Sequence, residues 1–284
     1  MTSIFDLPPE QSSYDYARVA VLPVPYDGTA SYRRGSARGP AALVEASRQV
    51  ETFDEDTGHR LEEIGIHLLR PVEQGGDPAG VADRVAAATA RVLGDGRFPV
   101  ALGGDHTAVT AGAVRAFVEA DHRPLGVLII DAHLDLRDEY EGSPFSHACN
   151  ARRLLDLGVE VLIVGARSWS AGEEAFRAAR GIEPVRADAV ARGEVSPAEI
   201  VERLPDSVYL SIDLDGLDPS VMPAVGTPEP GGLSWHFTLD LLAALCERRE
   251  LVGADIVELC PLAGDVRGDF AAARLLAKLL CRRF

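Results

Sequence analysis

Two carboxylates and an imidazole follow one apolar stretch of the chain at a spacing that suits metal binding. Residues 126–130 form a short, continuous apolar run, which is typical of a strand buried on both faces. Asp131, His133 and Asp135 come directly after it. Side chains alternate between the two sides of an extended chain, so these three would point the same way. They would lie at the carboxyl end of the strand, where open α/β sheets bind ligands.

The same arrangement follows two further apolar runs. Residues 208–212 lead into Asp213 and Asp215, whose carboxylates share one side of an extended chain. Residues 98–102 lead into Gly-Gly-Asp-His at 103–106, where the glycines suit a sharp turn from strand to helix and leave the histidine near the top of the sheet. If the three strands are parallel neighbours, six side chains of ligand type meet at one edge. These side chains are His106, Asp131, His133, Asp135, Asp213 and Asp215.

Four aspartates beside a strand core need positive charge nearby, because burying an unpaired carboxylate is very costly. The alternative is a purely structural role, in which they cap helices and cross-link loops. Six ligands are too many for one tetrahedral zinc ion, but carboxylates can bridge, so the set suits two ions about 3.5–4 Å apart. Oxygen and imidazole ligands without thiolate favour Mn(II), with Fe, Co or Ni as other divalent candidates.

The elements that would position these residues alternate between strand and helix about seven or eight times along the chain. We expect strands at residues 18–25, 64–69, 98–102, 126–130, 159–164, 182–185, 208–212 and 251–259. We expect helices at residues 41–50, 79–93, 107–120, 149–157, 172–180, 196–204, 238–247 and 270–280. This alternation predicts an α/β fold with a mostly parallel central sheet and helices on both faces. A TIM barrel also fits the count, but the irregular spacing of the strands favours an open sheet. No linker divides the chain, which predicts one domain over residues 1–284.

The composition limits the class of partner. The chain of 284 residues has a formal net charge of −16, which argues against nucleic acid and would favour a cationic substrate. It has no apolar run of membrane-spanning length, and its N-terminus lacks the features of a signal peptide. The four cysteines show no disulfide or metal spacing, so we expect free thiols and a cytoplasmic protein. We expect surface or packing roles for His59, His67, His122 and His236.

Three motifs, in this order, resemble the metal signatures of the ureohydrolase family, which contains arginases, agmatinases, guanidinobutyrases and formimidoylglutamases. They are the stretch at 103–106, Asp-Ala-His-Leu-Asp at 131–135 and Ser-Ile-Asp-Leu-Asp-Gly-Leu-Asp-Pro at 211–219. The resemblance runs from about residue 19 to about residue 280. It implies an arginase-like, three-layer α/β/α fold and a dimanganese centre that hydrolyses a guanidino group to urea. It also implies a homo-oligomer, either a trimer or a hexamer.

The resemblance also implies a role for each residue of the site. His106 and Asp135 would bind the first manganese ion, His133 and Asp215 the second, and Asp131 and Asp213 would bridge both. Ser146-His147 matches the pair that carries the family's mobile catalytic histidine. Glu258 matches the glutamate that grips the guanidinium, and residues 226–232 match a loop beside the site. Asp135 would also orient the attacking water by hydrogen bonding.

The implied reaction needs an attacking water, a grip on the guanidinium and a proton for the departing amine. Two bound metal ions lower the pKa of water far enough for attack at neutral pH. Glu258 would fix the guanidinium by charge-assisted pairing. His147, a loop histidine expected to have a near-neutral pKa, would deliver the proton. A metal-binding regulator without turnover is the alternative from another functional class.

The expected substrate is a small cationic guanidino compound, agmatine, which would be cleaved to putrescine and urea. Arginases follow their second motif with an asparagine and a serine that bind the α-carboxylate, and residues 136–142 lack that asparagine pattern. This stretch carries several acids, which suit a cationic tail and would repel a carboxylate, with Arg137 as the one exception. Guanidinobutyrate, arginine, guanidine and formimidoylglutamate remain alternative substrates.

Overall fold

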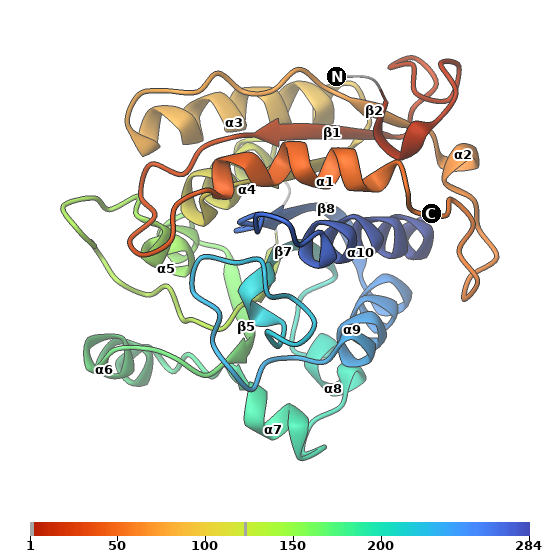
Figure 1. The fold of residues 1–284 in the computed structure, drawn as a ribbon. Coiled ribbons are helices and arrows are strands. Elements are labelled where there is room, and N and C mark those ends of the chain that lie inside the picture. The colour runs from red at the N-terminus through yellow and green to blue at the C-terminus, as the bar shows by residue number, and fades with distance from the viewer. Residues whose placement is uncertain (1–2, 122–123) are drawn as a thin grey trace.

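The computed structural model describes residues 3–121 and 124–284, and its eight strands form one parallel sheet (Figure 1). The strands are β1 (Val19–Val24), β2 (Ile66–Leu68), β3 (Phe98–Gly103), β4 (Leu125–Ile130), β5 (Glu160–Ala166), β6 (Val185–Arg186), β7 (Ser207–Asp213) and β8 (Glu250–Val257). Their order is β2-β1-β3-β8-β7-β4-β5-β6, and each neighbouring pair is parallel. Because β2 and β6 are edges, the sheet is open, and the TIM barrel alternative is wrong.

Helices cover both faces of the sheet and bury a separate apolar core on each. One face carries α1 (Gly39–Ser47), α7 (Ala187–Ala191), α8 (Pro197–Val201), α9 (Trp235–Arg248) and α10 (Arg267–Arg283). The other carries α3 (Pro78–Gly94), α4 (His106–Glu119), α5 (Asn150–Asp156) and α6 (Ala171–Arg180). Strand β4 serves both cores, since Leu128 and Ile130 enter the first and Val127 and Ile129 the second. The expected three-layer α/β/α fold is confirmed.

Two short helices were not predicted from the sequence. They are α2 (Leu61–Ile64) and α7, which have four and five residues. A single turn of helix is too short to show a periodic apolar pattern, so tertiary packing determines it instead. Neither helix contributes a side chain to the edge of the sheet where the sequence motifs converge.

The strand order differs from the one we expected at the motifs. Strand β4 pairs with β7, but β8 lies between β7 and β3, so the three motif strands are not all neighbours. Glu258 follows β8 directly. The insertion of β8 therefore brings Glu258 between the His106 motif on one side and the Asp213 motif on the other.

Close packing explains the glycines that precede His106. We expected them to suit a sharp turn from strand to helix, and neither Gly103 nor Gly104 needs a positive φ to form it. A Cβ atom on Gly104 would lie 2.2 Å from the carbonyl oxygen of Tyr26. The residue is glycine because the loop after β1 crosses the turn in direct backbone contact.

Two arginines order the long loop between β7 and α9, which passes beside the motifs. Arg167 donates to the carbonyl oxygens of Asp215 at 2.7 Å and Glu229 at 2.8 Å. Arg33 donates to the carbonyl oxygen of Val225 at 3.3 Å. A loop of this length has many backbone carbonyls that need donors, and charged donors satisfy them strongly.

The histidines and cysteines outside the motifs occupy packing or surface positions in the described chain. His59 and His67 each hydrogen-bond a backbone carbonyl oxygen at 2.8 Å, and His236 is exposed on α9. His122 lies outside the described residues. All four cysteines are free thiols, as expected. Among the described helices, none is both long and apolar enough to cross a membrane.

A buried ion-pair cluster attaches the loop before α2 to α10. Lys278 is 3% exposed, and its Nζ lies 3.0 Å from Asp54, 2.9 Å from Glu55 and 2.8 Å from Asp56. Burial opposes the charge of Lys278, but its hydrogen bonds to Asp56, Glu55 and Asp54 outweigh that effect and raise its pKa. The bond from Lys278 in turn lowers the pKa of Glu55 to about 2. The cluster is therefore fully charged at neutral pH.

We expect Lys278→Met to lower the free energy of unfolding by about 3–5 kcal/mol at pH 7, because it leaves the buried carboxylate of Asp54 with only the longer ion pair to Arg282, at 3.9 Å. The folded pKa values of Asp54, Glu55 and Asp56 are lowered. Their contribution to the free energy of unfolding is therefore complete above the pKa that these carboxylates have in the unfolded chain. It is lost as the pH falls through the pKa that they have in the folded protein. Urea denaturation of wild type and Lys278→Met between pH 7 and pH 3 should show that the difference between their free energies of unfolding narrows as the pH falls.

The matched control is Arg248→Met. Arg248 pairs with Glu202 at 3.1 Å, but both side chains are about half exposed. Removing such a surface pair should cost less than about 1 kcal/mol. Equal losses for the two variants would contradict the role assigned to the Lys278 cluster.

Candidate active site

The six side chains singled out in the sequence meet at the carboxyl ends of β3, β7 and β4. Nδ1 of His106 lies 3.2 Å from Asp213, 3.4 Å from Asp131 and 3.4 Å from Asp135, each measured to a carboxylate oxygen. On the side of His106 the cluster is fully enclosed, because these four residues are between 0% and 7% exposed. The expected convergence at this edge of the sheet is confirmed.

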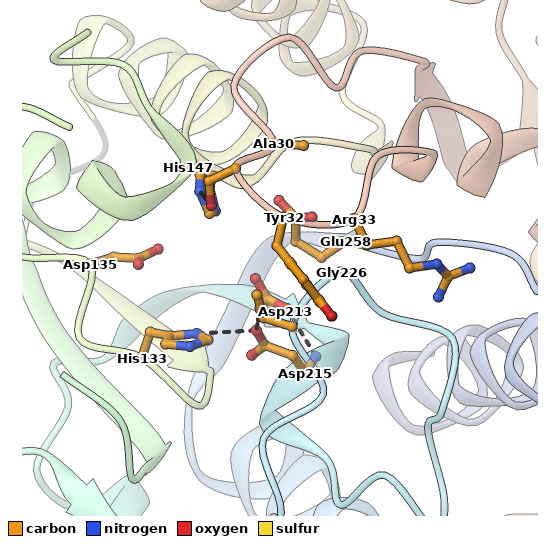
Figure 2. A pocket seen from close by; sticks show the side chains of 12 residues that line it. Ala30, Tyr32, Arg33, His133, Asp135, His147, Asp213, Asp215, Gly226 and Glu258 are labelled. Atoms are coloured by element: carbon orange, nitrogen blue, oxygen red, sulfur yellow. Dashed lines mark hydrogen bonds and ion pairs between the residues drawn. The ribbon is translucent and has the colours of Figure 1, made fainter. Parts of the chain in front are cut away.

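A second group of possible ligands shares Asp131 with the first. Nδ1 of His133 lies 3.1 Å from Asp215 and 3.5 Å from the other carboxylate oxygen of Asp131. Figure 2 shows His133 facing Asp215 across the pocket, with Asp213 beside it. His106, Asp131 and Asp135 offer ligand atoms within 4.8 Å of one another, and so do Asp131, His133 and Asp215. The geometry thus contains two adjoining sites that could each hold a cation.

The local backbone that brings these residues together is not the extended chain we expected. Strand β4 ends at Ile130, before the motif, and Asp135 has a left-handed φ of 50°. Asp215 lies in a short 3₁₀ helix, Leu214–Gly216, and not on β7. Glu258 also has a left-handed φ, of 63°. Non-glycine residues rarely adopt this conformation, and such strain concentrates at functional sites.

The crowded carboxylates shift one another's protonation. Burial, followed by repulsion from Asp215 and Asp131, raises the pKa of Asp213 well above its ordinary value. Burial and the charge of Asp131 raise the pKa of Asp135 to about 7. Burial opposes the charge of His133, but Asp215 and Asp131 outweigh it and raise its pKa to about 12. The cluster retains protons strongly because it demands positive charge, which divalent cations also supply.

The surroundings of His106 leave one ring nitrogen free to act as a ligand. Its buried Nδ1 makes no hydrogen bond, whereas its Nε2 lies 2.9 Å from the Ser211 hydroxyl and 2.8 Å from the Asn150 amide. Ser211 donates to the buried carboxylate of Asp255 at 2.7 Å. Such outer partners fix the ring orientation of metal-binding histidines. The residues present therefore fit two divalent cations.

Glu258 lies at the same small pocket, which has a volume of about 20 Å³ (Figure 2). One of its carboxylate oxygens accepts a hydrogen bond from the backbone N–H of His106 at 3.0 Å. Burial, then repulsion from Asp213 and Asp105, raises the pKa of Glu258 well above its ordinary value. A cation next to this carboxylate would relieve both effects, and a planar guanidinium suits it geometrically.

The loop after β1 holds His147 at the pocket, although nothing in the sequence marked that loop as functional. The Ser31 hydroxyl lies 3.0 Å from Nε2 of His147. The backbone N–H of His147 donates to the Thr29 hydroxyl at 2.8 Å, and that hydroxyl donates to buried Asp105 at 2.7 Å. Sequence analysis missed Thr29 and Ser31 because single hydroxyl residues in a loop form no pattern.

The environment of His147 also differs from our expectation. Burial is the main reason that its pKa falls to about 4, and the neighbouring charge of His133 contributes in the same direction. The expected near-neutral pKa is wrong in this structure, because the residue is not on a solvated loop. At neutral pH the imidazole is uncharged and can accept a proton.

The acids after the second motif do not face the pocket, which corrects our argument for a cationic tail. Asp138 pairs with Arg152 at 3.2 Å and with Arg153 at 2.7 Å, away from the site. Glu139 and Glu141 are exposed to solvent. None of these three acids lines the adjoining larger cavity, whose acidic lining residues are Asp135 and, from helix α6, Glu173.

Comparison with known proteins agrees with this geometry. The model of the arginase family matches residues 17–281. The chain belongs to the arginase family.

Two relatives and one solved structure show how far the similarity extends. The N(1)-aminopropylagmatine ureohydrolase of Synechocystis is 39% identical, with 95% of this chain and 90% of the relative covered. The enzyme of the same name from Thermus thermophilus is 41% identical, with 94% and 90% covered. The crystal structure of the agmatine ureohydrolase of Thermoplasma volcanium superposes with a TM-score of 0.88 at 35% identity, covering 96% of this chain and 92% of that one. The chain is thus an agmatinase-like ureohydrolase of the arginase family.

For this arginase-family chain we expect about two equivalents of manganese in reconstituted protein. Asp213→Ala should lose metal because it removes a ligand from the buried cluster, whereas His147→Ala should retain both ions and lose most of its turnover. General acid–base groups typically contribute about 10²–10⁴-fold. Elemental analysis and urea release measure the two effects separately. Wild-type protein that saturates at one ion would contradict the two-site arrangement.

We expect Thr29→Val to lower kcat about tenfold with little change in KM, because it releases the backbone N–H of His147 and leaves Asp105 without its hydroxyl donor. Thr52→Val is the matched control, since its hydroxyl donates to Glu62 at 2.7 Å away from the site. We expect the control to keep the kcat and KM of wild type, even if its free energy of unfolding is lower. If kcat is unchanged in Thr29→Val, the loop does not position His147.

Proposed function

We propose that the chain is a binuclear manganese ureohydrolase that hydrolyses agmatine to putrescine and urea. The observation that carries this proposal is the pair of ligand groups that share Asp131, with Glu258 facing them across a pocket of about 20 Å³. A guanidinium that pairs with Glu258 in this pocket would lie directly beside the two ligand groups. The product putrescine would give the enzyme a role in polyamine biosynthesis.

The proposed metal ligands are the six clustered side chains. His106, Asp131, His133, Asp135, Asp213 and Asp215 would hold two Mn(II) ions, with other divalent transition metals able to substitute. Bound in this way, the ions lower the pKa of water and stabilise negative charge that develops on the substrate. The buried Ser211–Asp255 pair would hold the His106 ring in the orientation that the first ion needs.

The remaining residues of the pocket would orient the substrate and move its protons. Glu258 would pair with the guanidinium and fix its carbon in the pocket. Asp135 would accept a hydrogen bond from the attacking water and so orient it. Nε2 of His147, which is uncharged at neutral pH, would take up a proton and pass it to the departing amine nitrogen. Ser31 would hold the imidazole in position for both transfers.

N(1)-aminopropylagmatine is the second candidate substrate. It carries the same guanidino head on a longer tail and would yield spermidine and urea. The specific observation in its favour is the cavity that adjoins the small pocket, which has a volume of about 310 Å³. The relatives from Synechocystis and Thermus thermophilus carry this compound in their names. Both candidates use the same head-group chemistry, so they differ only in what the tail contacts.

We expect manganese-loaded protein to release urea from agmatine or N(1)-aminopropylagmatine with kcat/KM at least about tenfold higher than from arginine or guanidinobutyrate, and at least about tenfold higher than for the release of formamide from formimidoylglutamate. Tails that end in a carboxylate would place it near Asp135 and Glu173, where like charges disfavour binding, and the one arginine that lines the cavity, Arg137, already pairs with Glu173. Urea measured for the four guanidino compounds, and formamide measured for formimidoylglutamate, test the proposal. A preference for any carboxylate-bearing compound would overturn the substrate assignment, and no urea from any compound would overturn the reaction.

Oligomeric state forms part of the same proposal, as a trimer or a hexamer. Light scattering coupled to size-exclusion chromatography gives the mass of the assembly directly and compares it with the chain mass of 30.3 kDa.

A further inference from the structure

The larger cavity continues directly from the pocket that would hold the guanidinium. His133, Asp135 and His147 line both spaces. The inner pocket measures about 20 Å³ and the outer cavity about 310 Å³. A substrate whose head group is bound beside Glu258 can therefore extend its tail into the outer cavity.

The outer cavity already accommodates a cation that belongs to the protein itself. Arg137 lines it, and its guanidinium carbon lies 4.7 Å from the centre of the Tyr140 ring. Its Nε lies 3.7 Å from the carboxylate of Glu173. Neither contact is tight, and the Arg137 side chain is 37% exposed. The environment thus suits a positive charge, but the charge that now occupies it is loosely held.

The carboxylate of Glu173 is rigidly placed. One oxygen accepts from the backbone N–H of Leu136 at 3.2 Å, and the other accepts from the backbone N–H and the hydroxyl of Ser170 at 2.9 and 2.8 Å. Glu173 is only 5% exposed. Its negative charge is therefore a fixed part of the cavity wall, whichever cation faces it.

Trp169 supplies a second aromatic wall. Its indole N–H donates to Glu174 at 2.9 Å, which fixes the ring, and Arg186 lies 5.5 Å from the ring centre. Arg186 does not line the cavity, although Trp169 does. Two aromatic rings and one fixed carboxylate thus surround the outer space, which is a combination that binds alkylammonium groups.

We propose that the outer cavity is a subsite for a second ammonium group of the substrate, in which Arg137 stands in for that ammonium until the substrate displaces it. The inference rests on the proposed ureohydrolase function and makes it more specific. It adds to the proposed hydrolysis of agmatine that linear guanidino compounds with a second amine nitrogen in the tail, such as N(1)-aminopropylagmatine, bind more tightly than agmatine does. Trp169 and Arg137 then determine which length of substrate tail the outer cavity accepts. They do so without contact with the reacting atoms of the substrate.

The test compares kcat/KM for N(1)-aminopropylagmatine and agmatine in two variants that should act in opposite directions. Arg137→Gln removes the competing cation, so the ratio of the two kcat/KM values should rise about tenfold. Trp169→Leu removes an aromatic wall, so the ratio should fall about tenfold. Both changes should appear in KM for the longer substrate, with kcat preserved, because the inner pocket is untouched.

Arg186→Gln is the matched control for Arg137→Gln. Each arginine stacks on an aromatic ring of the cavity wall and pairs with a carboxylate, Arg137 with Glu173 and Arg186 with Asp188. Only Arg137 lines the cavity. The control should leave the ratio within about twofold of wild type, and a rise equal to that of Arg137→Gln would overturn the proposal, because charge removal alone would then explain it.

Binding without turnover separates this inference from the reaction on which it rests. Spermidine and putrescine, titrated calorimetrically into manganese-loaded protein, test the subsite directly. Spermidine should bind more tightly than putrescine, and Arg137→Gln should widen that difference. If spermidine and putrescine bind with equal affinity in wild type and also in Arg137→Gln, the subsite is overturned even if urea is released. Failure to release urea, with spermidine still preferred, would overturn the reaction and leave the subsite standing.

Discussion

The structure depends on one electrostatic constraint, which is the burial of four aspartate carboxylates around two imidazoles. Asp131, Asp135, Asp213 and Asp215 are between 1% and 7% exposed. Like charges at this distance are tolerated only where positive charge is available and the frame cannot relax. An all-parallel sheet provides the frame, since it aligns the carboxyl ends of every strand at one edge. Arg167 and Arg33 hold the loop between β7 and α9 at that edge through hydrogen bonds to its carbonyl oxygens. Ser211 holds the His106 ring there through a hydrogen bond to Nε2.

The sequence was sufficient to identify the cluster but not the backbone that forms it. Apolar runs followed by ligand-type residues predicted the six members, because strand ends are readable from composition. The assumed extended geometry was wrong, since Asp135 is left-handed and Asp215 lies in a 3₁₀ turn. Local hydrogen bonds occur in both segments, because the carboxylates of Asp131 and Asp213 accept from the backbone N–H groups of His133 at 2.6 Å and of Asp215 at 2.9 Å. A distant hydrogen bond, from the backbone N–H of Ala132 to Asp215 at 3.1 Å, joins the two segments. The alternation of residue types predicted the convergence, but it did not predict these turns.

Side-chain direction in loops limited the prediction further. Asp138 appeared suited to a cationic substrate, yet Arg152 and Arg153, on a later helix, turn it away from the site. Thr29 was unmarked, yet it connects buried Asp105 to the backbone of His147. In both cases the hydrogen-bond or ion-pair partner is distant in sequence. The direction of a polar side chain in a loop depends on that partner and not on its neighbours in the sequence. The family resemblance identified His147 itself, because that residue follows a motif of fixed spacing.

The two adjoining spaces divide the chemistry between different elements of the fold. The inner pocket takes its acids from the ends of β7, β8 and the β4 loop, where the metal cluster limits what can change. The outer cavity takes Trp169 and Glu173 from the segment after β5, which contributes no ligand to that cluster. Substitutions there can alter the tail that fits without disturbing the head-group chemistry. Under the proposed function, this separation would allow relatives named for different guanidino substrates to match one chain over most of its length. The residues that distinguish them would then not need to be among the proposed metal ligands.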